Sequence, residues 1–268
     1  MTNHNGSVNM SSRDRLLLLV VGLGAGFLSG VFGVGGGILV VPGLMMFVRM
    51  EQRRAHGTSL AAVLPIAVAS LVTYWAHDHV DWPVALWLSI GALAGAFVGA
   101  SLLAIISKRN LALVFAIVLA IVGIRLFFTV SGDGRGEITV LVALAYVLLG
   151  LVTGALSGLL GIGGGAIMVP IMAVLFGIPS VIAKGTSLAV IIPTALMGTV
   201  RNRSNANVDM TAAVVVGVTG VVMAVVGAWV SARMSDAVSN ALFAVLLIAV
   251  AVRMLRQAWK ETTSARGQ

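Results

Sequence analysis

The sequence contains no cysteine and few charged residues. Asp, Glu, Lys and Arg make up 10% of its 268 residues, while 59% are hydrophobic. The absence of cysteine excludes disulfides, thiol catalysis and thiolate metal sites. The scarcity of charge, with a mean hydropathy of +1.07, excludes a soluble globular protein, which needs far more polar surface. We therefore expect an integral membrane protein.

The excess of basic residues does not indicate a nucleic-acid partner. The 17 Lys and Arg residues outnumber 9 Asp and Glu, but they are scattered between apolar runs and form no basic face. We interpret them as topology signals in loops. Residues 1–12 are polar and are expected to form a disordered tail. Arg13 and Arg15 precede an apolar run and imitate a signal peptide. The repeat described next argues against its removal.

The chain is an internal duplication. The stretch GFLSGVFGVGGGILVVP at 26–42 aligns with GALSGLLGIGGGAIMVP at 154–170, an offset of 154 − 26 = 128. At the same offset, HGTSLAAVLP at 56–65 aligns with KGTSLAVIIP at 184–193. Duplicated halves are typical of secondary transporters. We place the first transmembrane repeat at 13–137 and the second at 138–268, within one membrane domain.

Each repeat begins with a long apolar segment, at about 15–48 and about 138–177, followed by three ordinary spans. One helix of roughly 34 residues would be about 50 Å long, well beyond a hydrocarbon core of about 30 Å. If each segment instead folds back as a hairpin, thirteen of the 17 Lys and Arg residues share one side of the membrane; single crossings divide them ten to seven. The positive-inside rule therefore favours the hairpin.

The remaining three spans invert the second repeat relative to the first. The sequence thus predicts an all-α integral membrane protein with two inverted repeats, each a Gly-broken short-helix hairpin plus three spans, or about ten membrane segments. We expect a multi-pass protein of the inner membrane with both termini cytoplasmic. A re-entrant hairpin that never fully crosses gives the same topology, and the sequence leaves both forms open.

The glycine clusters Gly33–Gly37 and Gly161–Gly165 lie at the tips of these hairpins. Non-helical backbone at membrane depth occurs only where protein buries it or where it lines a water-filled cavity. Glycine readily adopts positive φ, so successive N–H groups can point at one anion, and the following helix start adds free amides. Two such turns from opposite faces would present donors to one anion near the midplane. The alternative is helix packing alone, which we expect at Gly26 and Gly30.

The GTSL segments, repeated at 57–60 and 185–188, supply hydroxyl groups. They either cap their own helix or donate to an oxyanion. The serines just before the glycine clusters are weaker candidates, because a serine commonly bonds to its own helix. The candidate substrate-binding residues are Ser29, Gly33, Gly35, Gly36, Gly37, Thr58, Ser59, Ser157, Gly161, Gly163, Gly164, Gly165, Thr186 and Ser187.

His56 and Lys184 occupy equivalent positions before the two GTSL segments. Lys184 would attract an anion from outside, and His56 would couple movement to protons. The alternative is that both are snorkelling residues at the membrane surface. The aromatic residues around Tyr74 and Trp75 are expected to form a belt at the outer interface.

These features favour a secondary transporter of a small anion. A passive anion channel is the alternative, because helix ends and glycine amides also serve conduction. A membrane-embedded enzyme is a weaker one, because its chemistry needs ionisable groups at membrane depth, and no paired-acid motif occurs within a span. We expect no catalytic residues, metal or cofactor. The expected partners are the anion, the lipid bilayer and a coupling proton or cation; the oligomeric state is left open.

The doubled motifs G-x-x-S-G-x-x-G-x-G-G-G…P and G-T-S-L…P, in two halves of one polytopic chain, resemble the sulfite exporter TauE/SafE family. The resemblance covers essentially the whole sequence after the N-terminal tail. It implies transport of sulfite, sulfonates, sulfoacetate or other small sulfur-containing and organic anions across a bacterial inner membrane, driven by an ion gradient. The family pattern falls on both glycine clusters and both GTSL segments. The pair His56 and Lys184 departs from the symmetry, which leaves a coupling role for either in doubt.

Overall fold

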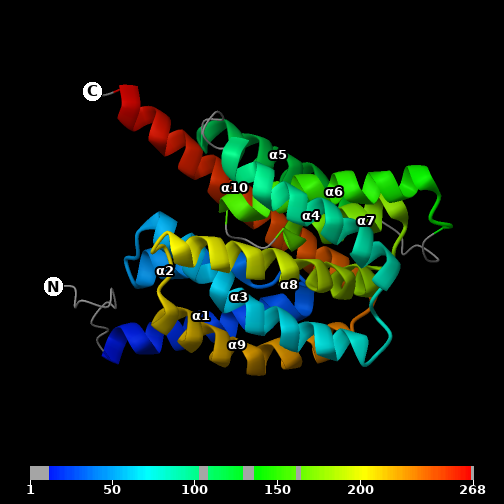
Figure 1. The fold of residues 1–268 in the computed structure, drawn as a ribbon, viewed down its shortest axis with the longest axis horizontal. Coiled ribbons are helices and arrows are strands. Elements are labelled where there is room, and N and C mark those ends of the chain that lie inside the picture. The colour runs from blue at the N-terminus through cyan, green and yellow to red at the C-terminus, as the bar shows by residue number, and fades with distance from the viewer. Residues whose placement is uncertain (1–11, 103–107, 129–135, 161–163, 267–268) are drawn as a thin grey trace.

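The computed structural model describes residues 12–102, 108–128, 136–160 and 164–266, and all regular structure among them is α-helical (Figure 1). The expected tail up to residue 11 and the candidates Gly161 and Gly163 lie outside these residues. The first half contains α1 (Ser12–Phe32), α2 (Gly37–Phe47), α3 (Gln52–Trp75), α4 (Trp82–Leu102) and α5 (Lys108–Phe127). The second half contains α6 (Val140–Leu160), α7 (Gly165–Phe176), α8 (Ser180–Ser204), α9 (Met210–Ser231) and α10 (Asp236–Arg266).

Six of the described helices, α1, α3, α6, α8, α9 and α10, are long and apolar enough to cross a membrane. By contrast, α2 and α7 have 11 and 12 residues, so each extends about 16–18 Å, roughly half the hydrocarbon core. Each glycine cluster therefore joins a full-length helix to a half-length one.

The first hairpin is antiparallel. A Cβ added to Gly36 would lie 3.3 Å from the Ala25 Cβ, and one added to Gly43 would lie 2.7 Å from the Val21 Cγ2. Residue numbers thus rise along α2 as they fall along α1. The predicted break and return of the long apolar segment are confirmed.

The two repeats pack against each other through exchanged helix pairs. The pairs α1 with α9 and α4 with α6 make the most extensive contacts, and the 128-residue offset converts one pair into the other. Small residues line these seams: a Cβ on Gly26 would collide with the Gly220 carbonyl, and one on Gly154 with the Ala92 carbonyl. The packing role expected for Gly26 is confirmed. Small residues at these positions allow the backbones of the paired helices to approach closely.

The outward faces of the helices are apolar. Along α9, for example, Val214, Val218 and Val222 are exposed while Gly217 and Ala224 are buried. This pattern suits a surface covered by lipid tails. In Figure 1 the start of α1 and the end of α10 lie toward the same end of the molecule. Helix α3 begins at that end and α8 at the opposite end, as inverted repeats require.

The start of α3 and α8 differs from the sequence prediction. We expected spans from about 57 and about 185, but α3 begins at Gln52 and α8 at Ser180. Both GTSL segments therefore lie inside their helices, more than one turn from the first residue. Their hydroxyls cannot cap the free amides at the start of these helices, which excludes the capping interpretation.

Candidate functional site

The site is built around two glycine turns, one from each repeat. Gly36 precedes α2 with φ 79°, and its equivalent Gly164 precedes α7 with φ 68°. These left-handed conformations favour glycine, and they lie directly before the first residues of α2 and α7. No side chain caps the first amides of α2 or α7. The third amides, those of Leu39 and Ile167, donate to the carbonyls of Gly36 and Gly164. The first two amides of each helix have no acceptor within their own helix, so they remain available to a ligand.

The two turns touch each other. A Cβ added to Gly165 would lie 2.7 Å from the carbonyl oxygen of Gly33 and 2.9 Å from the Cα of Val34. Ser187 Oγ, on α8, donates a hydrogen bond to the same Gly33 carbonyl oxygen at 2.5 Å. The glycine turn of the first repeat thus packs directly against the glycine turn of the second.

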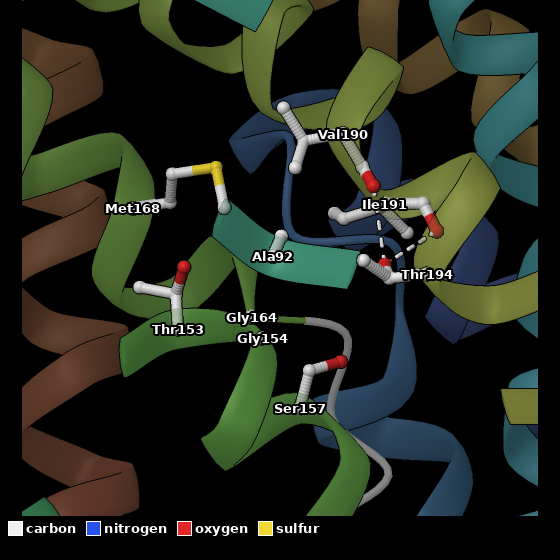
Figure 2. A pocket seen from close by; sticks show the side chains of 9 residues that line it. All are labelled: Ala92, Thr153, Gly154, Ser157, Gly164, Met168, Val190, Ile191 and Thr194. Atoms are coloured by element: carbon white, nitrogen blue, oxygen red, sulfur yellow. Dashed lines mark hydrogen bonds between the residues drawn. The ribbon is translucent and has the colours of Figure 1, made fainter. Parts of the chain in front are cut away.

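A narrow crevice borders the second of these turns (Figure 2). Its empty volume is about 150 Å³, and in this conformation it is too narrow to hold a water molecule. Helices α4, α6, α7 and α8 contribute its walls. The lining residues are Ala92, Thr153, Gly154, Ser157, Gly164, Met168, Val190, Ile191 and Thr194.

Three hydroxyl groups line the crevice. Thr153 Oγ1 donates to the Leu149 carbonyl at 2.8 Å, and Thr194 Oγ1 donates to the Ile191 carbonyl at 2.9 Å. Ser157 is 4% exposed and has no hydrogen bond with another described residue. A hydroxyl that turns from a helix carbonyl can donate to an anion instead. Together with the start of α7, these groups can bind a small oxyanion.

The first turn has different surroundings. At the 128-residue offset, Ala25 and Ile66 stand where the second repeat has Thr153 and Thr194. A Cβ on Gly36 would lie only 2.6 Å from the Ala25 carbonyl oxygen. The predicted pair of glycine turns is therefore present, but the described crevice lies at the second turn. Neither threonine was among the candidate residues predicted from the sequence. Their departure from the repeat symmetry was the available signal.

Thr58 and Thr186 have partners in the opposite repeat and do not line the crevice. Thr58 Oγ1 accepts a hydrogen bond from the Asp209 amide at 2.9 Å, and Thr186 Oγ1 accepts one from the Asp81 amide at 2.9 Å. The two bonds are equivalent under the 128-residue offset. Each fastens a GTSL helix of one repeat to the start of the fourth helix of the other.

The Thr58 contact also carries an ion pair. Arg54 Nη2 lies 2.8 Å from Asp209 Oδ2, and Asp209 Oδ1 accepts from the Ala212 amide at 3.1 Å. The position equivalent to Arg54 is Ile182. The Thr58 contact is therefore reinforced by an ion pair, whereas the Thr186 contact has no cation at the position equivalent to Arg54.

The remaining serine candidates are buried among the helices. Ser29 Oγ lies 3.4 Å from Ser70 Oγ, and Ser59 is buried within α3. Ser187 reaches the first glycine turn as described above. The structure thus brings Ser187 and the turns together, while Ser29 and Ser59 lie outside the crevice.

Lys184 does not lie at the aqueous surface that its sequence context predicts. Its side chain is 1% exposed, and Nζ donates to Ser231 Oγ at 2.9 Å and to Ser239 Oγ. It lies in the second turn of α8, covered by α9 and α10. Its equivalent, His56, is partly buried near the start of α3.

The aromatic belt is only partly as expected. Trp75 and Trp82 are exposed, as a membrane-interface belt requires. Tyr74 is buried instead, and its hydroxyl donates to the Gly30 carbonyl at 2.7 Å. The sequence could not separate Tyr74 from its neighbour because both end the same helix.

Comparison with known proteins identifies the family. The family model described as "Sulfite exporter TauE/SafE" matches residues 3–126 and again residues 146–268. The chain belongs to the TauE/SafE family. The two matches fall on the two halves of the duplication. The protein is therefore a multi-pass membrane transporter and not an enzyme.

Two relatives of this TauE/SafE protein extend over most of its length. A "Probable membrane transporter protein" of Xylella fastidiosa (strain 9a5c) is 30% identical over 251 residues, which cover 91% of this chain and 96% of the relative. "Probable membrane transporter protein YunE" of Bacillus subtilis (strain 168) is 28% identical over 254 residues, which cover 84% and 88%. Both relatives are named as transporters.

Proposed function

We propose that the protein moves small sulfur-containing or organic anions, of the sulfite, sulfonate or sulfoacetate type, across the bacterial inner membrane. The observation that carries the proposal is the contact between glycine turns of opposite repeats beside a hydroxyl-lined crevice. Gly164 and Gly165 would offer backbone amides, and Ser157, Thr153 and Thr194 would offer hydroxyls. The description of the matching family as sulfite exporters supports an anionic substrate.

We infer that the other candidate residues position this site. Ser187 would hold the first turn through the Gly33 carbonyl, and the surrounding glycines, Gly35 to Gly37, would allow that turn to approach its counterpart. Thr58 and Thr186 would each close one end of the transporter. His56, near the start of α3, is the candidate for coupling to a proton or cation gradient.

The inverted arrangement supports alternating access. The Thr58 and Thr186 bonds lie at opposite ends of the molecule, and both are formed while the crevice is closed to water. Breaking one bond at a time would expose the crevice to one side and then to the other, as in other inverted-repeat transporters. A passive channel would instead conduct through one continuous path, without alternating exposure of the crevice to the two sides.

Transport in proteoliposomes tests the proposal. Labelled sulfite or sulfoacetate should enter faster when the same unlabelled anion is trapped inside, because a carrier exchanges its substrate while a channel does not.

Thr194→Val should weaken the affinity for the anion about tenfold or more, the cost of a lost bond to a charged ligand. Thr219→Val is the matched control, because Thr219 Oγ1 also donates to helix carbonyls, those of Val215 and Val216, but lies outside the crevice. Equal effects of the two variants would contradict the site, and the absence of counterflow would favour a channel.

The proposed orientation places both termini in the cytoplasm. The chain has no native cysteine, so single cysteines report their own position. Cysteines at the exposed positions Arg53 and Asn205 should react only from the cytoplasmic side, and those at Asp78 and Ser235 only from outside. Labelling of positions 53 and 205 from opposite faces would contradict the inverted arrangement.

A further inference from the structure

Lys184 carries a buried positive charge, whereas none of the residues that line the crevice is charged. The hydrogen-bond acceptors of its ammonium group are the neutral hydroxyls of Ser231 and Ser239. No carboxylate of a described residue lies within 4.0 Å of Nζ. Asp236, at the start of α10, acts on the ammonium from beyond that distance and is partly exposed, so water screens its charge. The ammonium therefore has no buried counter-charge.

The rest of the described interior is close to electrically neutral. Asp209 is the other buried charged side chain among these residues, and Arg54 pairs with it. The same turns connect the ends of α1 and α6 to the starts of α2 and α7. The partial negative charge at each helix end therefore lies near the partial positive charge at the following helix start. These helix-end charges largely offset one another. Lys184 therefore carries one positive charge that no buried group offsets.

This charge lies close enough to the crevice to affect an anion there. A Cβ on Gly33 would lie 2.6 Å from the Lys184 Cα, so Lys184 lies directly against the first glycine turn. Ile191, which lines the crevice, follows Lys184 by two turns of α8, or about 10 Å along the axis. For a separation of about 10 Å between the ammonium and the anion, and an effective dielectric constant of about 20, Coulomb attraction strengthens the binding of a monovalent anion about tenfold.

The valence of the substrate follows from this charge balance. A bound monovalent anion leaves the interior neutral, whereas a divalent anion leaves a net negative charge. A net charge at membrane depth is costly, and the desolvation cost rises steeply with charge. We propose that Lys184 is the counter-charge for a single monovalent anion. Within the class of anions named above, the transporter then selects monovalent sulfonates and hydrogensulfite over dianions, including sulfoacetate, which carries both a sulfonate and a carboxylate. This inference rests on the crevice being the substrate site.

Anion binding to the purified protein tests the inference. The probes are methanesulfonate, a monovalent anion, and sulfate, a divalent anion with a similar head group, each measured by isothermal titration calorimetry. Wild type should bind methanesulfonate at least about tenfold more tightly than sulfate, and Lys184→Met should lose about tenfold in methanesulfonate affinity. Arg233→Met is the matched control, because it removes the same charge from an exposed side chain on the turn after α9. Its affinities should equal those of wild type.

A second variant keeps the test valid if Lys184→Met does not fold. The first repeat has a histidine, His56, at the equivalent position, and Lys184→His gives the second repeat the same residue. An imidazole gains a positive charge on acidification, so methanesulfonate should bind this variant more tightly at about pH 4.5 than at about pH 7.5. A purely structural role for Lys184 would not create that dependence.

The outcomes separate the two proposals. Equal methanesulfonate affinity in Lys184→Met and Arg233→Met, equal binding of both probes by wild type, or no new pH dependence in Lys184→His would overturn the role of Lys184 and leave the crevice as the site. Failure of wild type to bind either probe, with no counterflow of sulfite or sulfoacetate, would overturn the proposed function and this inference together.

Discussion

Alanine substitutions at the equivalent glycines Gly36 and Gly164 should separate stability from transport. Both residues have positive φ, 79° and 68°, so each alanine costs about 1–2 kcal/mol of unfolding free energy for the left-handed backbone alone. At Gly164 the new methyl would lie 3.1 Å from the Thr153 carbonyl oxygen, a contact that a small shift relieves. At Gly36 it would lie 2.6 Å from the Ala25 carbonyl oxygen, so α1 must move. That displacement adds about 1–3 kcal/mol.

The expected order for transport is the reverse. The Gly164 methyl would enter the crevice beside Ser157, so we expect Gly164→Ala to lower the transport rate by more than about tenfold, comparable to losing a bond to a charged ligand. Gly36→Ala should reduce the amount of folded protein more strongly, while the molecules that fold keep their substrate affinity.

Thermal unfolding of the purified variants measures the first effect, and proteoliposome uptake normalised to folded protein measures the second. Gly36→Ala should show the lower melting temperature and Gly164→Ala the lower transport rate. If Gly164→Ala transported like wild type while folded Gly36→Ala did not, the substrate site would belong at the first turn and the reasoning would be refuted.

Two further predictions concern the ends of the structure. Thr58→Val and Thr186→Val should each lower the free energy of unfolding by about 1–3 kcal/mol, because the amide of Asp209 or Asp81 loses its acceptor; melting temperatures equal to that of wild type would contradict this. In the loop after α3, burial lowers the pKa of His79 below its ordinary 6.5, the neighbouring His77 lowers it further, and Asp78 opposes both. The unfolded chain therefore binds the proton more tightly, so stability is complete above about pH 6.5 and decreases as the pH falls below it. The melting temperature of His79→Gln should fall less on acidification than that of wild type, and parallel profiles would count against this cause.

The break in each long apolar segment could be predicted from the sequence because it follows from length and geometry. A helix through Gly33–Gly37 would exceed the bilayer, and clustered glycine marks the point where it ends. The inversion followed from the odd number of remaining spans and the distribution of Lys and Arg. These are properties of segments, and they do not depend on which side chains meet.

The detailed site could not be predicted, because its contacts join residues far apart in the chain. The partner of Thr58 is 151 residues away, and that of Thr186 is 105 residues away. Sequence proximity to polar residues suggested that Lys184 lies at an interface, but α8 begins early enough to carry it under α9 and α10. Thr153 and Thr194 stand in otherwise apolar helices, where a single threonine gives little signal by itself.

The exchange of partners between the repeats has a consequence for the ancestry of the molecule. Helix α1 finds its close neighbour in α9, and each GTSL threonine fastens to the opposite half, so neither half by itself contains the contacts that complete its own packing. A half-length forerunner could have built this architecture only as a dimer of two identical chains inserted in opposite orientations. Fusion of the two copies then freed each to diverge, which is how one half could come to carry a lysine where the other carries a histidine.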